Sequence, residues 1–312
     1  MRLVRGMLLV VVLAALAAFG IYAFRDPERR TLDAAARAAA PGRFVHLDDG
    51  TTHYEVAGPD GAPVVLLAAA FSVPAYIWDP LFRQLADSGF RVIRFDYYGR
   101  GWSDRIDAAY DQDLFVRQMA GLLDSLGIRE PIALAGLSYG AAMVTSFADR
   151  HPERVRAIVY LDPVFNNRRP LPPHERSAFR WNVHMVLRGG LDRMANGQLD
   201  DFLHPERQPD WVARYREQFQ FRGTRESLRR TRAAIAVAPD QAEQLRRVGA
   251  VERPVLVLWG RQDAGASFEE SGAVMAALPR GRLVPVDSAG HLPHIERPDV
   301  VVREMVGFLR GR

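Results

Sequence analysis

Apolar residues in this chain gather in short runs that alternate with longer segments of helical periodicity. Runs of four to eight apolar residues bounded by turn residues are typical of buried strands, and the intervening segments of amphipathic helices. Strands alternating with helices predict a mostly parallel sheet with right-handed crossovers, an α/β fold. The pattern predicts strands at 43–47, 51–56, 63–68, 91–95, 131–135, 155–161, 255–259 and 283–286, and helices at 81–88, 111–126, 141–148, 272–278 and 300–309.

The segment from Val164 to Gly249 breaks this alternation. It is rich in arginine, aromatic residues and proline, and has no clear strand pattern. We interpret residues 164–249 as a helical cap inserted after the sixth strand, above the carboxyl ends of the strands, where ligands bind in such sheets. Residues 43–163 and 250–312 then form the core domain.

The N-terminus contains an uncharged apolar run from Met7 to Phe24. As a helix it is about 27 Å long, close to the thickness of a hydrocarbon core. Tyr22 and Phe24 suit a membrane interface. We assign residues 1–24 to a membrane anchor or signal segment and favour an uncleaved anchor. A signal peptide with a small-residue cleavage site at 18–20 is the alternative. Residues 25–42, rich in alanine and arginine, are expected to form a linker.

The flanking charges give two opposite indications of membrane orientation. Two arginines precede the apolar run and five follow it by residue 43, which favours a cytoplasmic domain. The short basic leader before an apolar core is instead typical of an export signal. We favour a single-pass protein with an extracytoplasmic catalytic domain. There are two alternatives. The protein could be secreted or periplasmic after cleavage of a signal peptide, or its domain could face the cytoplasm.

The amino-acid composition excludes several kinds of functional site. The 312 residues are 48% hydrophobic and 25% charged, as in globular proteins, and all 41 basic residues are arginine. No basic run is interleaved with aromatic residues on one element, so nucleic-acid binding is not expected. The absence of cysteine excludes disulfides, thiolate metal sites and a cysteine nucleophile. We expect neither a cofactor nor a metal. The sequence gives no indication of oligomeric state.

The stretch Gly136-Leu137-Ser138-Tyr139-Gly140 joins a buried strand to a helical pattern. In a nucleophile elbow, a serine flanked by glycines occupies a tight turn between a strand and a helix. The residues two before and two after the serine must be small, because strand and helix approach closely there. Ser138 is therefore the candidate nucleophile.

A serine hydroxyl needs a base that accepts its proton, and an acid that holds the base in one tautomer. His291 follows the last strand and is the favoured base; His294 and His151 are weaker candidates. Asp263, in a short turn after strand 255–259, is the favoured acid, and Asp162 the second candidate. The chain order Ser138, Asp263, His291 matches that of the serine hydrolases built on such a sheet.

At this point the chain resembles the α/β-hydrolase fold family from about Phe44 to the C-terminus. The resemblance is carried by the motifs at 95–104, 136–140, 259–263 and 290–298. It implies an α/β-hydrolase fold with a mostly parallel eight-stranded sheet, flanking helices and a helical cap. It also implies a hydrolase with Ser138 as nucleophile, Asp263 as acid and His291 as base. Serine at the nucleophile position argues against epoxide hydrolases and haloalkane dehalogenases, which use aspartate there.

One position departs from the family pattern. The family usually has His-Gly after the third strand, where this chain has Ala69-Ala70 followed by Phe71. By position, the backbone N–H groups of Phe71 and Tyr139 are expected to hold the oxyanion. Alanine adopts positive φ less readily than glycine, so this loop could be shaped differently. The polar turn with Asp96, Gly99, Gly101 and Ser103 is interpreted as structural.

Together these features predict a serine hydrolase that cleaves carboxylic esters through an acyl-enzyme on Ser138. An anchor beside an apolar cap favours a small ester substrate with an acyl chain or lipid-like character, and a subset of the cap arginines could meet an anionic headgroup. A C–C bond hydrolase or a peptidase with the same triad is the alternative among enzymes. A catalytically silent ligand-binding protein of the same fold is the alternative outside them.

Overall fold

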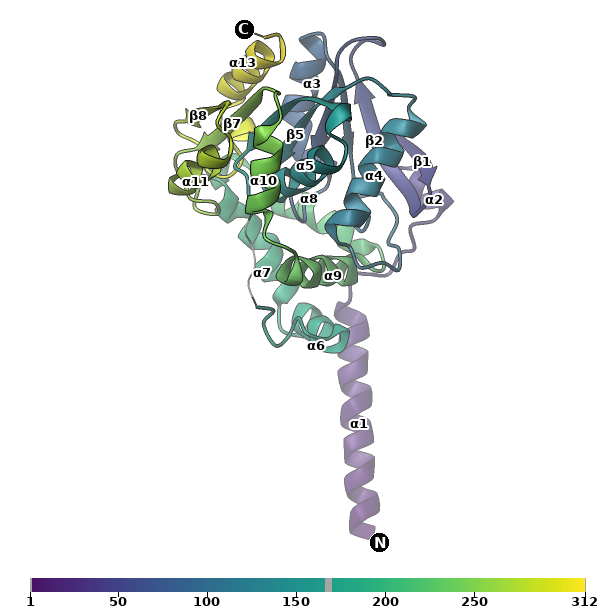
Figure 1. Cartoon of the computed structure of the whole chain (residues 1–312). Helices are drawn as coiled ribbons and strands as arrows, with labels where there is room; N and C mark the ends of the chain where they lie inside the picture. The colour runs from purple at the N-terminus through teal and green to yellow at the C-terminus, as the bar shows by residue number, and fades with distance from the viewer. Residues whose placement is uncertain (1, 166–169, 312) are drawn as a thin grey trace.

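The computed structural model describes residues 2–165 and 170–311, and confirms the α/β-hydrolase fold. Eight strands form one sheet in the order β1-β2-β4-β3-β5-β6-β7-β8 (Figure 1). β2 pairs antiparallel with β1 and β4, and all other neighbours are parallel. The strands are β1 Arg43–Leu47, β2 Gly50–Ala57, β3 Val64–Ala68, β4 Arg91–Phe95, β5 Ile132–Leu137, β6 Val155–Leu161, β7 Val255–Gly260 and β8 Gly281–Val286.

Continuous apolar runs fix the centre of this sheet. Every residue of β3, β5 and β7 is buried, as expected for parallel strands covered on both faces. Helices α3 (Asp79–Asp87), α12 (Pro293–Glu296) and α13 (Pro298–Leu309) pack on one face. Helices α4 (Gln112–Ser125), α5 (Tyr139–Arg150), α10 (Gln241–Ala250) and α11 (Ser271–Ala277) pack on the other.

The segment between β6 and β7 is helical, and it divides into two parts. α6 (Ala178–Asn182), a π-helical turn (Val183–Leu187), α7 (Gly190–Asn196), α8 (Trp211–Glu217) and α9 (Thr224–Val237) lie below the carboxyl ends of the strands in Figure 1. α10 instead contacts α5 and α11 on the side of the sheet, and Gln241 donates to the Ala142 carbonyl. The part that covers the sheet edge therefore ends before α10, although the expected cap extends to residue 249.

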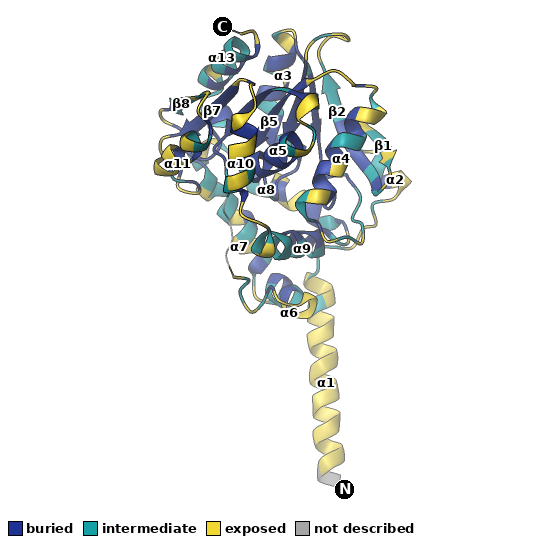
Figure 2. Ribbon diagram, viewed as in Figure 1, coloured by how far each residue is buried: buried dark blue, intermediate teal, exposed yellow. Residues whose placement is uncertain are grey.

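The N-terminal helix α1 (Arg2–Arg25) projects away from the domain, with side chains that are almost all exposed (Figure 2). Residues Val4–Arg25 contain an 18-residue window with a mean hydropathy of 2.6, and the helix is long and apolar enough to cross a membrane. The linker contains the short helix α2 (Ala34–Ala38), which Asp33 caps through the Ala36 N–H. Residues 26–30, expected to belong to a linker, are hydrogen-bonded to α9 and the turn before it.

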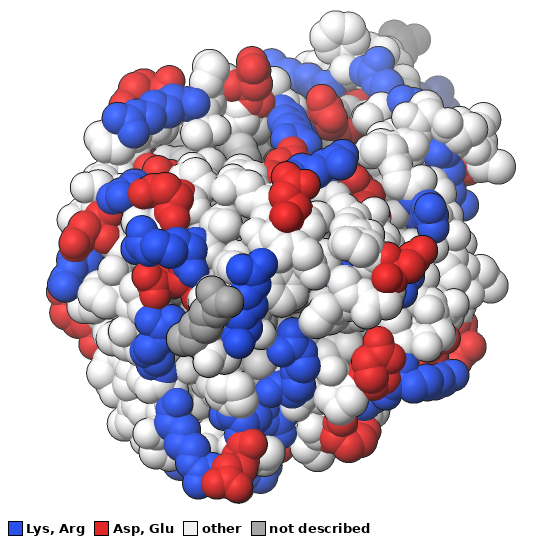
Figure 3. Space-filling view, turned by 90° about the horizontal axis from the view of Figure 1, so that it is seen from above, with Lys and Arg blue, Asp and Glu red and all other residues white. Residues whose placement is uncertain are grey.

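Both arginine and acidic side chains occur on the face opposite α1, and the blue side chains gather in the lower part of the view (Figure 3). Many surface arginines pair with a carboxylate, among them Arg117 with Asp49, Arg247 with Asp149 and Arg282 with Glu304. Each such pair neutralises positive charge at the surface.

The close approach of β3, β5 and α5 requires glycine at position 140. A Cβ there would lie 2.3 Å from the Ala68 carbonyl oxygen and 2.5 Å from that of Ala69. We expect Gly140→Ala to lower the free energy of unfolding by about 3 kcal/mol, because the backbone cannot move aside cheaply. Thermal or urea unfolding measures the change. Gly272→Ala is the matched control, since nothing lies within 4 Å of its Cβ; equal losses in both variants would contradict the prediction.

Candidate active site

Ser138 occupies the sharp turn between β5 and α5. Its φ is +53° and its ψ −122°, a strained conformation for a residue with a side chain and the one a nucleophile elbow imposes. The Ser138 N–H donates to the Leu161 carbonyl, and the Ser138 carbonyl accepts from the Ala141 and Val164 N–H groups. These bonds fix the turn on both sides while the side chain remains partly exposed.

The expected acid and base lie at the same edge of the sheet and contact each other. His291 Nδ1–H donates to Asp263 Oδ2 over 2.7 Å, and both residues are buried. Asp263 Oδ1 accepts from the N–H groups of Gly265 and Ala266 at 2.7 and 2.9 Å. Because both carboxylate oxygens are held, the imidazole is fixed with Nε2 as the nitrogen left for proton transfer.

The structure thus brings Asp263 and His291 together, and places Ser138 on the same edge. β5, β6 and β7 are consecutive in the sheet, and Ser138 and Asp263 follow the ends of β5 and β7. Among the hydrogen bonds of the described residues, none joins Ser138 Oγ to His291 Nε2. Catalytic hydrogen bonds are often long in ligand-free sites and tighten when substrate binds.

The environment shifts the pKa values of this pair in opposite directions. Burial opposes the charged form of His291, but the hydrogen bond and negative charge of Asp263 outweigh it and raise the His291 pKa. Burial likewise opposes the charged form of Asp263, and the contact with His291 lowers its pKa nonetheless. The pair therefore favours an imidazolium beside a carboxylate, the charge distribution that forms when a serine is deprotonated.

A pH prediction follows from the raised His291 pKa. The base works only when neutral, so kcat/KM for a p-nitrophenyl ester is expected to rise with pH through the pKa of His291. Because that pKa is raised, the midpoint of the acid limb should lie above the ordinary value of about 6.5. Initial rates measured from about pH 5 to about pH 9 test this. A flat profile, or a midpoint below the ordinary value, would count against His291 as base.

Asp162, the second candidate acid, lies against this pair. Its Oδ1 accepts from the Gly260 N–H over 2.8 Å, and its φ is +41°. Ligand atoms of Asp162, Asp263 and His291 all lie within 4.8 Å of one another. Burial and the negative charge of Asp263 raise the pKa of Asp162 well above its ordinary value. This shift favours the protonated form of Asp162, in which its Oδ2, which has no hydrogen-bond partner among the described residues, can donate to Asp263.

Two carboxyls and an imidazole so close together are also a possible metal-ligand set. Here the contact between His291 Nδ1 and Asp263 Oδ2 has the length of a hydrogen bond, and Asp162 faces the Gly260 N–H. His291 Nδ1 and both carboxylate oxygens of Asp263 are thus already engaged in hydrogen bonds within the protein.

The loop expected to hold the oxyanion is shaped without glycine. Ala69 and Ala70 are buried and have no positive φ, so the departure from His-Gly imposes no backbone strain of that kind. In the described chain, the backbone N–H groups of Phe71 and Tyr139 have no acceptor. They remain available to a ligand atom, and the Phe71 and Tyr139 rings meet edge to face, 6.1 Å apart.

A buried arginine that sequence reasoning left without a role holds this loop. Arg100 is 1% exposed, and its guanidinium donates twice to the Phe71 carbonyl, at 3.0 and 2.9 Å. It also donates to Thr231 Oγ1 on α9 at 3.0 Å. Burial lowers the Arg100 pKa to about 10, so it stays charged. The only signal in the sequence was its place within the motif at 95–104.

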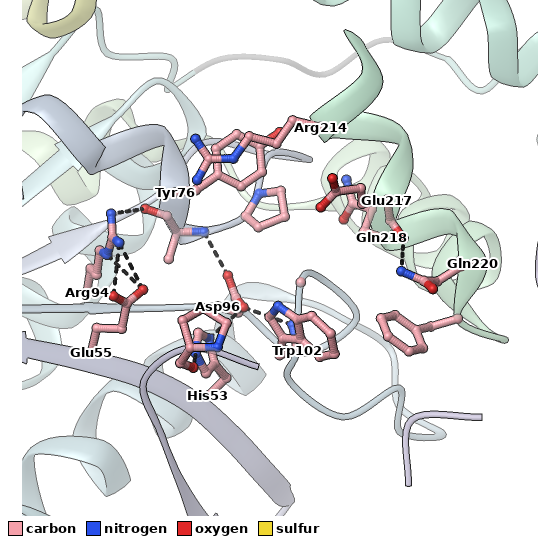
Figure 4. Close-up of a pocket in the computed structure, with 15 residues that line it drawn as sticks. His53, Glu55, Tyr76, Arg94, Asp96, Trp102, Arg214, Glu217, Gln218 and Gln220 are labelled. Carbon is pink, nitrogen blue, oxygen red and sulfur yellow. Dashed lines mark hydrogen bonds and ion pairs between the residues drawn. The ribbon is translucent and has the colours of Figure 1, made fainter. Parts of the chain in front are cut away.

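Asp96 binds backbone N–H groups of the loop after β3 and of the turn that contains Arg100. These contacts agree with the interpretation of Asp96 as a structural residue. Its Oδ1 accepts from the Ala75 N–H at 2.7 Å, and its Oδ2 from the Trp102 N–H and from His53 Nδ1, both at 2.8 Å (Figure 4). His53 Nε2 donates to the Pro41 carbonyl, so both ring nitrogens face acceptors. Burial opposes its charge, but Asp96 outweighs burial and raises the His53 pKa. This buried ion pair borders a cavity of about 340 Å³ that Ser138 does not line.

The remaining candidate histidines have structural contacts. His294 is fully buried, and its Nε2 donates to the Ile77 carbonyl over 2.9 Å. Burial lowers its pKa to about 4. His151 ends α5 and packs on Phe147 at 5.0 Å.

The cap contributes a group that sequence reasoning missed. The Asp201 carbonyl accepts from the His291 N–H over 2.9 Å. The Glu296 carboxylate joins the loop before His291 to the cap, because it accepts hydrogen bonds from the N–H groups of Gly290 and His204. Burial raises the pKa of the Asp201 carboxyl to about 6, and the charge of His291 opposes that rise. Asp201 lies in the cap, where the chain's family resemblance is weakest.

A cavity of about 960 Å³ reaches the nucleophile elbow at Tyr139. Ser138 and His291 are not among its lining residues. α9 and the turn after it line one side with Arg229, Arg230 and a group of small and aliphatic residues, and the other side is formed by residues 107–113, three of which are aspartates. The apolar wall consists of Ala233, Ala234, Ile235, Val237 and Ala238.

Comparisons with known proteins agree with this architecture. A model of the alpha/beta hydrolase family matches residues 61–304. Epoxide hydrolase A of Mycobacterium tuberculosis is 28% identical, over 82% of this chain and 92% of its own. A 2-hydroxy-6-oxononadienedioate/2-hydroxy-6-oxononatrienedioate hydrolase of Cupriavidus pinatubonensis is 26% identical, over 87% and 96%. A thermophilic esterase from Thermogutta terrifontis superposes with a TM-score of 0.72 at 26% identity, over 86% of this chain and 99% of its own. The chain is a member of the alpha/beta hydrolase family.

Proposed function

We propose that this hydrolase cleaves carboxylic esters, with Ser138 as nucleophile, His291 as base and Asp263 as the acid that orients it. The observation that carries the proposal is a partly exposed serine at a strained elbow, on the same sheet edge as a buried, hydrogen-bonded His–Asp pair. These are the roles that a serine needs to act as a nucleophile at neutral pH. Similarity to the Thermogutta terrifontis esterase supports the same reaction class.

In the proposed mechanism, His291 Nε2 removes the proton from Ser138 Oγ as that oxygen attacks the ester carbonyl carbon. The carbonyl oxygen becomes an oxyanion, which the N–H groups of Phe71 and Tyr139 hold. The imidazolium returns its proton to the leaving alcohol, and an acyl-enzyme remains on Ser138. Water, deprotonated by His291, then attacks the acyl-enzyme, and release of the acid restores Ser138.

The cavity beside Tyr139 indicates the kind of ester. The part of its wall formed by Ala233, Ala234 and Ile235 on α9 suits an acyl chain, and Arg229 and Arg230 on the same helix line the cavity with positive charge. An acyl-chain or lipid-like ester is therefore the proposed substrate class. The relative from Cupriavidus pinatubonensis keeps a C–C bond hydrolase as the alternative reaction. The relative named an epoxide hydrolase does not lead us to propose epoxide opening, because serine stands where the family's epoxide hydrolases have aspartate.

Labelling by a fluorophosphonate tests the nucleophile, and a series of p-nitrophenyl esters with increasing acyl length tests the substrate class. We expect labelling of the purified protein, and kcat/KM that rises from acetyl to medium-chain esters. A protein that takes no label and hydrolyses no ester would overturn the proposal and favour the ligand-binding alternative. A labelled protein that cleaves vinylogous 1,5-diketones and no esters would favour the C–C hydrolase.

We further propose that α1 is an uncleaved single-pass anchor and that the catalytic domain is extracytoplasmic. The supporting observation is that residues 7–24 are uncharged and almost all exposed, which is costly in water. Protease added to intact cells should degrade the domain. A membrane-bound domain that is protected from protease would indicate the opposite orientation, and a soluble protein lacking residues 1–20 would indicate a cleaved signal.

A further inference from the structure

The end of α1 is joined to the cap by a buried cluster of charges. The Arg225 side chain is 4% exposed and lies 3.0 Å from Asp26 Oδ2 and 3.6 Å from Glu28 Oε2. The Glu28 carboxylate also accepts from the N–H groups of Gly223 and Arg225 at 2.9 and 2.7 Å. It thereby caps the N-terminus of α9, where a negative charge is stabilising. We call Asp26, Glu28 and Arg225 the latch.

Backbone and side-chain bonds extend the latch on both sides. The Arg30 N–H donates to the Gln220 carbonyl, and the Arg222 N–H to the Arg30 carbonyl, each over 2.9 Å. On the other side, Trp181 Nε1 donates to the Arg225 carbonyl at 2.8 Å, which ties α6 to the same residue. α1 also contacts the π-helical turn that follows α6. α1 and α6 are therefore held in a fixed relation, whereas a flexible linker would leave the anchor free to swivel.

The surface next to this junction has the composition of a membrane interface. Phe179 on α6 is 77% exposed, and Arg176 and Arg180 beside it are exposed as well. Within the described chain, neither arginine has an ion-pair partner. We call Arg176, Phe179 and Arg180 the α6 face. An aromatic side chain flanked by cations suits the headgroup region of a bilayer that contains anionic lipid. Figure 1 draws α6 near the upper end of α1, and the π-helical turn that follows α6 contacts α1.

We propose that the α6 face rests on the bilayer that α1 crosses, and that the latch holds it there. The inference rests on the proposed anchor, because without a membrane-spanning α1 the latch has no bilayer to face. One consequence concerns the substrate. α9 carries Arg225 at its first turn and lines the cavity beside Tyr139 with its last turns. The latch therefore fixes, relative to the lipid surface, the helix along which an acyl chain would enter.

The absence of native cysteine makes the test direct. Full-length single-cysteine variants Leu16→Cys, Phe179→Cys and Val251→Cys are labelled with a fluorophore and reconstituted in vesicles of phosphatidylcholine and phosphatidylglycerol. Nitroxide lipids then report proximity to the bilayer. Leu16 in α1 reports the anchor, and Val251, which is exposed beyond α10, serves as the matched control. We expect quenching at positions 16 and 179 and none at 251.

The outcomes separate the two proposals. Quenching at 16 without quenching at 179 would overturn the α6 contact and leave the anchor standing. No quenching at 16 would refute the anchor and this inference with it. Neither readout requires ester hydrolysis, so failure of the proposed reaction is recorded separately.

The latch is tested by Asp26→Asn combined with Glu28→Gln in the Phe179→Cys chain, which leaves the cap sequence otherwise intact. Quenching at 179 is expected to fall, because the cap is no longer held beside the end of α1 by Asp26 and Glu28, while quenching at 16 is unchanged. Hydrolysis of a soluble acetyl ester should persist, and hydrolysis of a long-chain ester in the vesicles should fall. Asp60→Asn, which removes an exposed carboxylate on the loop between β2 and β3, is the control. Unchanged quenching at 179 would contradict the role of the latch.

Discussion

Ser138→Ala is expected to lower kcat/KM for p-nitrophenyl esters by about 10⁵-fold and to abolish fluorophosphonate labelling. The variant loses only Oγ, so His291, Asp263 and both proposed oxyanion N–H groups keep their positions. Removal of the nucleophile nevertheless eliminates the acyl-enzyme route, and only binding and oxyanion stabilisation remain. Initial rates and labelling of the purified variant, beside its thermal unfolding curve, measure the effect.

Ser125→Ala is the matched control for this variant. Ser125 is exposed at the end of α4, and its hydroxyl donates to the Leu122 carbonyl. It should label and hydrolyse esters like the unmodified protein. If Ser138→Ala labelled as strongly as this control, the nucleophile would lie elsewhere in the chain.

Asp263→Asn should have the second-largest effect, with a loss of about 10⁴-fold in kcat. The amide is close in shape to the carboxylate, but it can present its NH₂ to His291 Nδ1 and favour the wrong tautomer. It also removes the negative charge that raises the His291 pKa. The residual activity should therefore have its acid limb at lower pH than that of the unmodified protein.

Two other aspartates give this prediction its controls. Asp287 lies on the same loop as His291 and pairs with Arg261 at the surface, so Asp287→Asn should change kcat less than about twofold. Asp162→Asn keeps a hydrogen-bond donor toward Asp263 and is expected to cost far less than Asp263→Asn. A larger loss in Asp162→Asn than in Asp263→Asn would make Asp162 the working acid.

Several elements were predicted to within a few residues because their determinants are local. β4 and β6 have the bounds that their apolar runs indicate, and α3, α11 and α13 differ by one or two residues at their ends. At the elbow, two glycines and a serine specify a strand-turn-helix whose close contact allows no side chain at position 136 or 140. The α/β-hydrolase fold follows from the same alternation of strands and helices.

The cap shows where local pattern stops being sufficient. Its helices were expected, but the separation of α10 from the part above the sheet edge was not. α10 has an amphipathic pattern like that of α9, and only its contacts with α5 and α11 assign it to the side of the sheet. Asp201 was missed for the same reason, because its contact with His291 joins the cap to a loop of the core domain.

The sequence by itself determined the fold class, the elbow, and the chain order Ser138, Asp263, His291, because strand and helix periods and tight turns are set by neighbouring residues. The tertiary structure decided which of these side chains meet. It brought Asp162 against the His291–Asp263 pair, placed Arg100 behind the Phe71 carbonyl, and joined Arg225 to Asp26 across 199 positions. Such contacts depend on how distant elements pack, and no local pattern of apolar and polar residues records that packing.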